Sequence, residues 1–351
     1  MCNLANAFVE RGISTDVVLV RSEGPFHSLL DPGVRVRSFN VSRPMWALFP
    51  LVGYLRREKP RSLLSALDHT NLIAVAARLL AGVELRHVVS QRVDASIRPS
   101  LLKQPLEIVN YWLLGFGYRH ADAVTAVSRG VARSLESSHR VPSELIRVIY
   151  NPVEVLEPRP GIAHRDHHPW LESHEIPLIV GAGRLTHQKG FDILLEAFRL
   201  VCDYRPVRLV ILGAGEDEAR LVELIHRLDL DESALLAGFV DDPWLWMRQA
   251  DVFVLSSRWE GLPGVLLQAM ACGTPVVSTD CPSGPDEILE NGKWGKLVPV
   301  ENPRAMADAI IETLESPTSP PVAERAAQFD LTSSVNAYLE VLGILDDKGH
   351  S

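Results

Sequence analysis

The segment EGLPGVLLQAMACGTPVVS, residues 260–278, combines an acid, a glycine-rich turn and the start of a helix. The apolar stretch VFVLSS at 252–257 predicts a buried strand, and Glu260 lies three positions after its end. A helical pattern then covers 263–272. An acid at the end of a buried strand can orient a polar ligand. The simpler interpretation is an ordinary strand–loop–helix connection in which the acid has no special role.

The turn after Glu260 has the composition of an anion site. Gly261 and Gly264 let the backbone turn and approach a ligand closely, and Pro263 suits the first position of a helix. Gln268 lies further along the helix and can face the same side. Unbonded N–H groups at a helix start bind phosphate oxygens; the candidates here are those of Gly264, Val265 and Leu266.

Two cations occupy a second loop, GAGRLTHQKG at 181–190. Arg184 and Lys189 stand between an apolar run and a helical pattern, with glycines beside them. Arginine offers a planar fork of donors and lysine a point charge, which together suit a diphosphate. The alternative is a pair of solvated loop cations.

A third loop, ILGAGEDEAR at 211–220, has a Gly-x-Gly pattern at the end of an apolar run. Glu218 stands where a dinucleotide fingerprint needs its third glycine, and the run does not open its domain. A nicotinamide site is therefore not expected, although close approach of this backbone to a nucleoside is.

These loops connect elements that alternate between strand and helix. Near-continuous apolar strands that alternate with helices predict a parallel sheet covered on both faces. In the second half we expect strands at 177–183, 207–213, 234–239, 252–257 and 275–279, with helices at 191–201, 216–228, 242–249 and 263–272. In the first half we expect strands near 16–21, 62–66, 86–90, 122–127 and 145–150, and helices near 3–11, 43–58, 70–81, 101–118 and 128–138.

The fold class is therefore α/β, with two doubly wound parallel-sheet domains. We expect an N-terminal domain at 1–155, a linker at 156–176, a C-terminal domain at 177–328, and a last helix and tail at 329–351. Open parallel sheets bind ligands at the carboxyl ends of their strands. The chemistry is therefore expected in the strand-to-helix loops, at a cleft between the domains.

Charge divides the chain more sharply than composition does. Residues 1–160 hold 20 Lys and Arg against 14 Asp and Glu, whereas residues 161–351 hold 15 against 30. A basic half without DNA-binding motifs predicts an anionic membrane surface or a phosphate-bearing ligand, and no nucleic acid; a mere difference in solubility is the alternative. No apolar run is long enough to span a bilayer, and the start has no pattern of a secretory signal. The four cysteines lack metal-site spacing and are expected as free thiols.

Other candidates are weaker. The Asp-x-Asp at 229–231 ends a helical pattern, which favours helix termination over a metal site. The four linker histidines lack metal-site spacing, so no metal is expected; they are His164, His167, His168 and His174. His69, Asn71 and Arg92 follow first-half strands and are the candidates for binding an acceptor.

Three segments together resemble glycosyltransferase family 4, of the GT-B architecture: YRHADAVTAVSRGVARSL, GRLTHQKGFDILLEAF and SRWEGLPGVLLQAMACGTPVVSTDCPSGPDEIL. The resemblance covers nearly the whole chain. It implies transfer of a sugar from a nucleotide sugar, with retention at the anomeric carbon, by a front-face mechanism without protein nucleophile, cofactor or metal. The donor is expected to be a UDP-sugar, with GDP-mannose second.

The resemblance also implies roles for single residues. Arg184 and Lys189 would hold the donor diphosphate, beside Gly183, and Glu260 would bind hydroxyls of the donor sugar. Gln268 would bind the ribose, where the family commonly has Glu. The loop 261–265 is implied to supply backbone donors to phosphate and sugar; it comprises Gly261, Leu262, Pro263, Gly264 and Val265. Phe239 and Val240 lie in the segment that is implied to hold the base.

The start of the chain departs from the family pattern, which has a strand and a glycine-rich loop before the helix at 3–11. Without that strand, two neighbours in the first sheet are expected to be unpaired. A late start codon, a truncation or a degenerate protein each explains the difference.

The motifs resemble those of bacterial enzymes that build capsule, O-antigen or other surface polysaccharide. Such enzymes act on saccharide or lipid-linked acceptors. We therefore expect a cytoplasmic protein, with peripheral contact at the inner face of the plasma membrane. The alternatives are a nucleotide-sugar epimerase of the same architecture and a non-catalytic nucleotide-sugar-binding protein.

Overall fold

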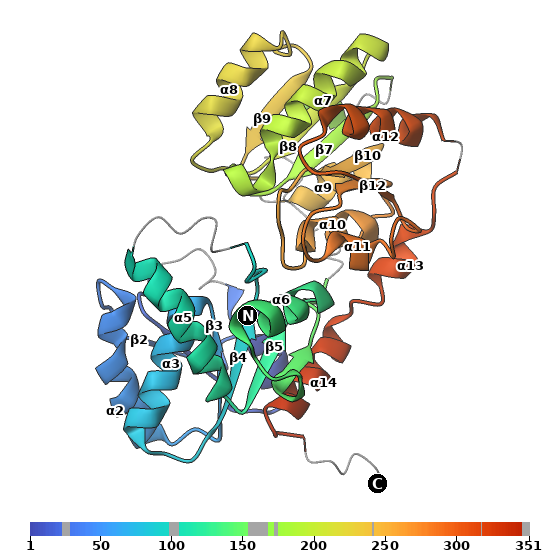
Figure 1. Ribbon diagram of the computed structural model, residues 1–351. Coiled ribbons are helices and arrows are strands. Elements are labelled where there is room, and N and C mark those ends of the chain that lie inside the picture. The colour runs from blue at the N-terminus through green and yellow to red at the C-terminus, as the bar shows by residue number, and fades with distance from the viewer. Residues whose placement is uncertain are drawn as a thin grey trace. The chain divides into compact units, whose positions relative to one another are not determined.

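A computed structural model of the chain describes residues 1–22, 29–97, 105–153, 168–171, 175–240, 242–316 and 318–345. It divides into two compact units (Figure 1). Unit 1 comprises Met1–Tyr150 and Leu331–Ser351, and unit 2 comprises Asn151–Asp330. The end of the chain thus belongs to the same unit as its beginning. No helix among the described residues is long and apolar enough to cross a membrane.

Unit 2 is built on a six-stranded parallel sheet in the order β12-β11-β10-β7-β8-β9. Its strands are β7 (Leu178–Ala182), β8 (Arg208–Leu212), β9 (Ala234–Gly238), β10 (Val252–Leu255), β11 (Val276–Thr279) and β12 (Lys296–Val298). The chain winds from β7 outward to β9, then crosses back to β10 on the other side of β7. The strand order therefore reverses between β7 and β10, and this reversal is where open parallel sheets bind ligands.

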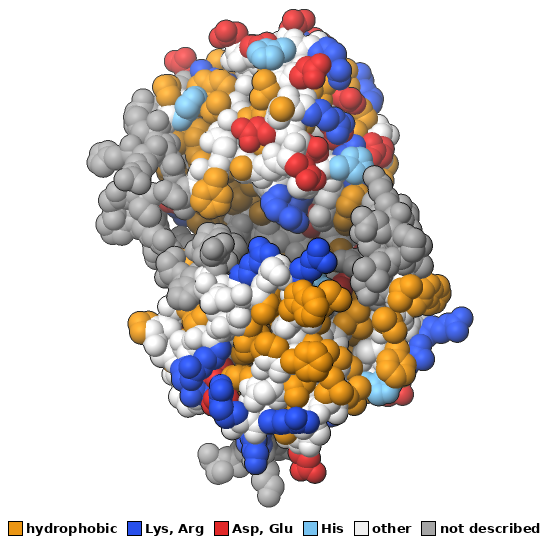
Figure 2. All heavy atoms as spheres, turned by 90° about the vertical axis from the view of Figure 1, so that its left-hand side faces the viewer, with side chains coloured by type: hydrophobic (Ala, Val, Ile, Leu, Met, Phe, Trp, Pro, Cys, Tyr) orange, Lys and Arg blue, Asp and Glu red, His pale blue; other side chains and the backbone are white. Residues whose placement is uncertain are grey.

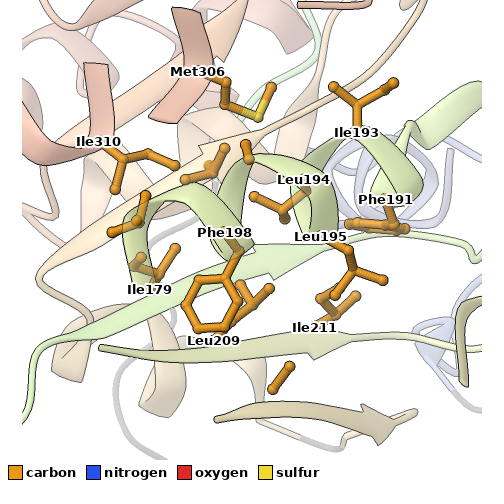
Figure 3. Close-up of a cluster of buried hydrophobic side chains, with 14 of the residues drawn as sticks. Ile179, Phe191, Ile193, Leu194, Leu195, Phe198, Leu209, Ile211, Met306 and Ile310 are labelled. Atoms are coloured by element: carbon orange, nitrogen blue, oxygen red, sulfur yellow. The ribbon is translucent and has the colours of Figure 1, made fainter. Parts of the chain in front are cut away.

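Helices cover both faces of this sheet. They are α7 (Phe191–Tyr204), α8 (Glu218–Arg227), α9 (Pro243–Gln249), α10 (Gly264–Ala271), α11 (Pro285–Ile288), α12 (Pro303–Glu315) and α13 (Val322–Ala326). One core joins α7, α8 and α12 to the sheet, with Phe198 and Leu194 of α7 between Leu209 and Ile310 (Figure 3). The opposite face packs against α9 and α10. Burial on both faces explains why the strands are apolar throughout.

Unit 1 contains two separate parallel sheets, β1-β2 and β3-β4-β5-β6. The strands are β1 (Asp16–Leu19), β2 (Arg35–Ser38), β3 (Ser62–Ala66), β4 (Arg86–Gln91), β5 (Ala123–Ala126) and β6 (Ile146–Val148). The helices are α1 (Cys2–Glu10), α2 (Leu48–Glu58), α3 (Asp68–Ala81), α5 (Pro105–Arg119), α6 (Arg129–His139) and α14 (Leu331–Val341), with the 3-10 turn η2 (Pro44–Ala47) leading into α2. Helix α14 packs on α1, where Tyr338 and Leu339 join Leu4 and Phe8 in one core.

The expected pair of incompletely paired strands is present. Among the described residues β1 pairs only with β2, and β3 pairs only with β4 on one side. Most residues of β1 and β3 are half-buried, whereas β5 is buried throughout. Strands of a parallel sheet are normally covered on both faces and flanked on both edges. Each of these two strands therefore keeps a free edge.

The expected elements recur with small shifts at their ends, and five further helices and strands of the described residues lie outside the prediction. They are β2, α11, β12, α12 and α13. Strand β2 reads Arg-Val-Arg-Ser and alternates exposed with half-buried positions, so it lacks the apolar run that marked the other strands. Its partner β1 and its register hold it in place.

His87 predicts a pH dependence of stability. It is buried in β4, where its Nε2 lies 3.0 Å from Ser65 Oγ. Burial, helped by the charge of Arg78, lowers the pKa of His87 from 6.5 to about 4. The unfolded chain takes up this proton at about its ordinary pKa, so the free energy of unfolding should fall by about 3 kcal/mol between pH 6.5 and 4.

Urea unfolding at several pH values in this range measures the effect. The variant His87→Gln should lose most of the slope against pH that the parent shows over this interval. The exposed His69→Gln serves as control and should keep the slope. An unchanged slope in His87→Gln would show that other groups cause the acid sensitivity.

Candidate functional site

The carboxyl ends of β7 and β10 bring a lysine and an acid together. Lys189 Nζ lies 2.6 Å from Glu260 Oε1, and Ser257 Oγ donates a hydrogen bond of 2.6 Å to the same oxygen. Glu260 is only 6% exposed. A buried carboxylate needs a partner of opposite charge or hydrogen-bond donors, and this one has both. The sequence prediction had named both residues but had not paired them.

The loop that carries Lys189 is fastened to the loop that carries Glu260 by hydrogen bonds to main-chain carbonyls. Ser256 Oγ donates to the Lys189 carbonyl at 2.8 Å, and the Arg258 amide donates to the Gln188 carbonyl at 2.8 Å. Gln188 Nε2 donates in return to the Trp259 carbonyl at 2.9 Å. We call these contacts between 186–190 and 256–260 the loop clasp. It fixes the lysine beside the acid independently of their charges.

Arg258 connects the loop clasp to the start of α7. Its guanidinium donates to the His187 carbonyl at 2.7 Å and pairs with Asp192, in the first turn of α7, at 2.9 Å. It also pairs with Glu301. Burial alone would raise the pKa of Asp192, but the bonds and charge of Arg258 hold that pKa below its usual value. Sequence reasoning missed Arg258, because an arginine beside Glu260 gives no sign of partners so far along the chain.

Two glycines leave room for this arrangement. A Cβ atom on Gly183 would lie 3.2 Å from Lys189 Cε, so the lysine stem runs over the glycine. Gly190 has a φ of +62°, and a Cβ there would lie 2.2 Å from the Ser256 carbonyl oxygen. The predicted role of Gly183 beside the diphosphate thus includes making space for Lys189.

The Gly-x-Gly of the third loop packs against the protein's own backbone. A Cβ on Gly213 would lie 1.9 Å from the Gly183 carbonyl oxygen, and one on Gly215 would lie 2.3 Å from that of Leu185. The Leu185 amide also donates to the Ala214 carbonyl at 3.0 Å. These two glycines therefore allow close packing against the loop 181–190, which carries Arg184 and Lys189. This packing explains the glycines without the expected approach of their backbone to a nucleoside.

Helix α10 starts one residue later than predicted. Pro263 is its N-cap rather than its first residue, and the Leu266 amide donates to the Pro263 carbonyl at 3.1 Å. The prediction that Leu266 is free to bind an anion was therefore wrong. The amides of Gly264 and Val265 have no acceptor among the described residues, so two donors remain at this helix start.

The turn 261–263 is buried and held from one side by a second loop. A Cβ on Gly284 would lie 2.7 Å from Pro263 Cδ, and the Glu260 amide donates to the Pro282 carbonyl at 3.2 Å. Gly261 and Leu262 are buried, while Gly264 is exposed. The backbone that precedes α10 is thus fixed before any ligand arrives.

The remaining predicted donor-site residues are open to solvent. Arg184 is exposed and makes no hydrogen bond or ion pair with the described residues. Gln268, in α10, and Val240 are half-buried. Phe239, directly after β9, is 82% exposed. An exposed cation and an exposed aromatic ring can each bind a ligand without first breaking an internal contact.

Cys281 lies near the acid but is not suited to act as a nucleophile. It is buried, and burial raises its pKa to about 12, with the nearby charge of Glu260 adding to the effect. The thiolate, which is the reactive form, is therefore disfavoured.

The residues predicted to bind an acceptor lie in unit 1. His69 and Asn71 follow β3 and Arg92 follows β4, so the three stand at the same edge of one sheet. His69 is exposed, whereas Asn71 is 1% exposed and donates from Nδ2 to the Ser90 carbonyl at 3.2 Å. Asn71 thus braces the ends of two neighbouring strands.

The weaker metal candidates gain no support. Asp229 directly follows the C-cap of α8 with a φ of +53°, as helix termination predicts. Within the part of the chain that the structure describes, no three His, Cys, Asp or Glu side chains form a metal-ligand group. His164, His167 and His174 lie outside the described residues; His168 accepts a hydrogen bond from the Trp170 amide.

Comparison with known families agrees with this geometry. Residues 1–155 match the model described as Glycosyltransferase Family 4, and residues 164–329 match the model described as Glycosyl transferases group 1. The chain belongs to glycosyltransferase family 4. The two matches meet close to the boundary between unit 1 and unit 2.

Two of the relatives are bacterial glycosyltransferases whose names state a lipid-linked or lipopolysaccharide product. An N-acetylgalactosaminyltransferase of Campylobacter jejuni, named for a diphospho-undecaprenol-linked acceptor, is 30% identical over 71% of this chain and 66% of its own length. The lipopolysaccharide core glycosyltransferase LpsE of Rhizobium meliloti is 33% identical over 48% of this chain and 50% of its own. The chain thus spans between half and two thirds of these two relatives.

Solved structures confirm the GT-B fold of this family 4 chain. HepE of Anabaena, in complex with UDP and glucose, has a TM-score of 0.80 at 21% identity, covering 98% of this chain and 95% of its own. The lipopolysaccharide galactosyltransferase WaaB has a TM-score of 0.70 at 18% identity, covering 98% and 94%. The predicted fold class is therefore confirmed.

The loop clasp predicts a measurable rigidity. In Arg258→Ala, both loops lose their anchor to α7, so the amides of 186–190 and 256–260 should exchange with solvent at least tenfold faster, which is on the order of 1.4 kcal/mol less protection. Hydrogen-exchange mass spectrometry measures this. The control is Arg304→Ala, which removes an exposed ion pair with Asp308 and should leave both loops unchanged. Equal exchange in the parent and Arg258→Ala would contradict the role of Arg258.

Proposed function

We propose that this protein transfers a hexose or N-acetylhexosamine from a nucleotide sugar, a UDP-sugar in the first instance, to a saccharide or lipid-linked saccharide acceptor in polysaccharide synthesis. The observation that carries the proposal is the buried Lys189–Glu260 pair next to the open amides of α10. The Campylobacter relative, which acts on a diphospho-undecaprenol saccharide by name, and HepE, solved with UDP, support the choice of substrates.

The donor diphosphate is held by positive groups from two loops. Arg184 and Lys189 supply full charges, and the amides of Gly264 and Val265 supply partial charges at the start of α10. Lys189 and the two amides are held in place before the reaction, so they stabilise the negative charge that grows on the leaving diphosphate with little cost of reorganisation. The exposed Arg184 adds a further positive charge. This charge stabilisation is the main catalytic contribution that we assign to the chain.

Glu260 positions the sugar. One of its oxygens is occupied by Lys189 and Ser257, which leaves the other to accept hydrogen bonds from sugar hydroxyls. A carboxylate held this way sets the orientation of the ring toward the acceptor. It need not act as a base, and no covalent intermediate on the protein is required.

The nucleoside binds at the same carboxyl edge of the unit 2 sheet, away from the sugar. Gln268 accepts a ribose hydroxyl through its side-chain carbonyl, and the exposed ring of Phe239, next to Val240, stacks on the base. His69 and Arg92 of unit 1 contact the acceptor, while Asn71, the third acceptor candidate, donates a hydrogen bond to the Ser90 carbonyl in β4. The reaction takes place in the cytoplasm, at the inner face of the plasma membrane when the acceptor is lipid-linked.

A panel of UDP- and GDP-sugars tests the function, with mass spectrometry of the products formed on lipid-linked saccharides. Addition of one sugar to an acceptor supports transfer. An altered nucleotide sugar formed without acceptor would identify an epimerase, and binding of UDP without any product would identify a non-catalytic binding protein.

Arg184→Ala tests the diphosphate site without disturbing the fold, because Arg184 is exposed and has no internal partner among the described residues. Loss of one of the cations that bind the diphosphate should lower kcat/KM for the donor by about 10- to 100-fold. The control is Arg227→Ala, an exposed arginine on α8, which should keep the parent value. If both variants retain full activity, the diphosphate binds elsewhere.

Gln268→Glu tests the ribose contact. A carboxylate accepts a stronger hydrogen bond than an amide, so the Kd for UDP should fall about threefold to tenfold. Isothermal titration with UDP and with inorganic pyrophosphate separates the two parts of the donor. Pyrophosphate affinity should stay unchanged, and an unchanged Kd for UDP would remove Gln268 from the nucleoside site.

A further inference from the structure

Helix α5 exposes an apolar stripe to solvent. Val109, Trp112, Leu113 and Phe116 recur at helical spacing, and their exposure lies between 48% and 68%. The opposite side of the same helix is buried through Tyr111, Leu114 and Tyr118. A helix that is apolar on both sides normally has a partner on each. Among the described residues, this stripe has none.

A second exposed apolar group lies nearby on the same unit. Met45 and Trp46 of η2 and Phe49 of α2 are 58–74% exposed, and Leu79 and Leu80 at the end of α3 are more than half exposed. Helix α3 packs against α2 and η2 as well as against α5, so it joins the two groups. Figure 2 shows hydrophobic side chains gathered over this side of unit 1, with Lys and Arg side chains around them.

The charge around these residues is predominantly positive, although Arg57 pairs with Glu58. Residues 35–61 hold seven Lys and Arg and a single Asp or Glu. Arg43, Arg56, Arg57 and Lys59 are all exposed. Arg56 Nη2 donates to the Leu80 carbonyl at 2.8 Å, which places a guanidinium at the end of α3, beside the exposed leucines.

We propose that this surface docks on an anionic lipid bilayer. We name it the basic–apolar face, and it comprises Met45, Trp46, Phe49, Leu79, Leu80, Val109, Trp112, Leu113 and Phe116 with Arg43, Arg56, Arg57 and Lys59. Exposed Trp and Phe enter the interfacial region of a bilayer, while basic residues beside them bind anionic headgroups. The inference deepens the proposed function, since it brings unit 1 to lipid-linked acceptors.

Charge favours lipid over a second copy of the chain as the occupant. A symmetric dimer through this face would set the same basic residues of both copies against each other, and like charges at an interface oppose association. An anionic surface instead meets the arginines with opposite charge and the aromatic rings with an apolar layer. Both features of the face are then used together.

Flotation of the full chain with vesicles tests the proposal without any sugar, so its outcome is independent of transfer activity. We expect strong binding to vesicles of roughly 70% phosphatidylcholine and 30% phosphatidylglycerol, because the anionic lipid gives them a large negative surface potential. Binding to vesicles of pure phosphatidylcholine should be weak. Binding that is equal for both vesicles, or that ignores 0.5 M salt at about a 4 Å Debye length, would overturn the proposal.

Variants separate the two parts of the face. Arg43→Gln with Arg57→Gln should weaken binding about twentyfold, at roughly fivefold per basic residue, and Trp112→Ser with Phe116→Ser should weaken it by at least tenfold. The matched control is Tyr204→Ser with Val222→Ser, which removes exposed apolar side chains of unit 2 and should leave binding unchanged. Thermal unfolding checks that each variant folds.

If Trp112→Ser with Phe116→Ser does not fold, Trp112→Phe provides the second measurement. Quenching of tryptophan emission by brominated lipid should decrease in that variant. A dimer of the parent in light scattering that dissociates in Trp112→Ser with Phe116→Ser, without lipid binding by the parent, would instead assign the face to self-association and overturn the proposal.

Discussion

The site depends on one constraint, the adjacency of β7 and β10 where the strand order of unit 2 reverses. Two loops separated by about seventy residues of sequence leave the sheet side by side there, and hydrogen bonds from one main-chain amide and two side chains to their backbone carbonyls hold them together. Within this clasp the buried Glu260 side chain meets Lys189 and Ser257 at 2.6 Å. A buried ion pair adds little stability by itself, so its value lies in fixing a cation and an acid for a ligand.

Sequence alone predicted the fold class, which the solved structures confirm. Apolar runs closed by glycine and proline marked the strand ends, and so Arg184, Lys189 and Glu260 were predicted on strand-to-helix loops, where the structure has them. The pairing of Lys189 with Glu260 could not be read from local pattern, because the spatial order of strands is set by packing over the whole sheet. The same holds for Arg258 and Gly213, whose partners lie far along the chain. Pro263 was misplaced by one residue because an N-cap and a first helical position share the same sequence signal.

The two units differ in how completely their strand edges and apolar side chains are covered by other parts of the same unit. In unit 2 every strand end leads into a loop with a described structural or ligand-facing role, and the sheet is covered on both faces. In unit 1, β1 and β3 keep free edges and α5 keeps an apolar stripe. Surfaces of this kind are unfavourable in water. The exposed stripe of α5 is therefore the part of unit 1 that most favours an interaction beyond the chain itself.

The return of α14 to unit 1 has a consequence for biosynthesis. The core that holds Leu4 and Phe8 is closed by Tyr338 and Leu339, so a ribosome must translate all of unit 2 before the first unit can be completed. At roughly 5–20 residues per second, the nascent amino-terminal half waits on the order of ten to forty seconds with one side of its core open. The segment Asn151–Asp330, which forms unit 2, is fully synthesised before the residues of α14 that close the first core.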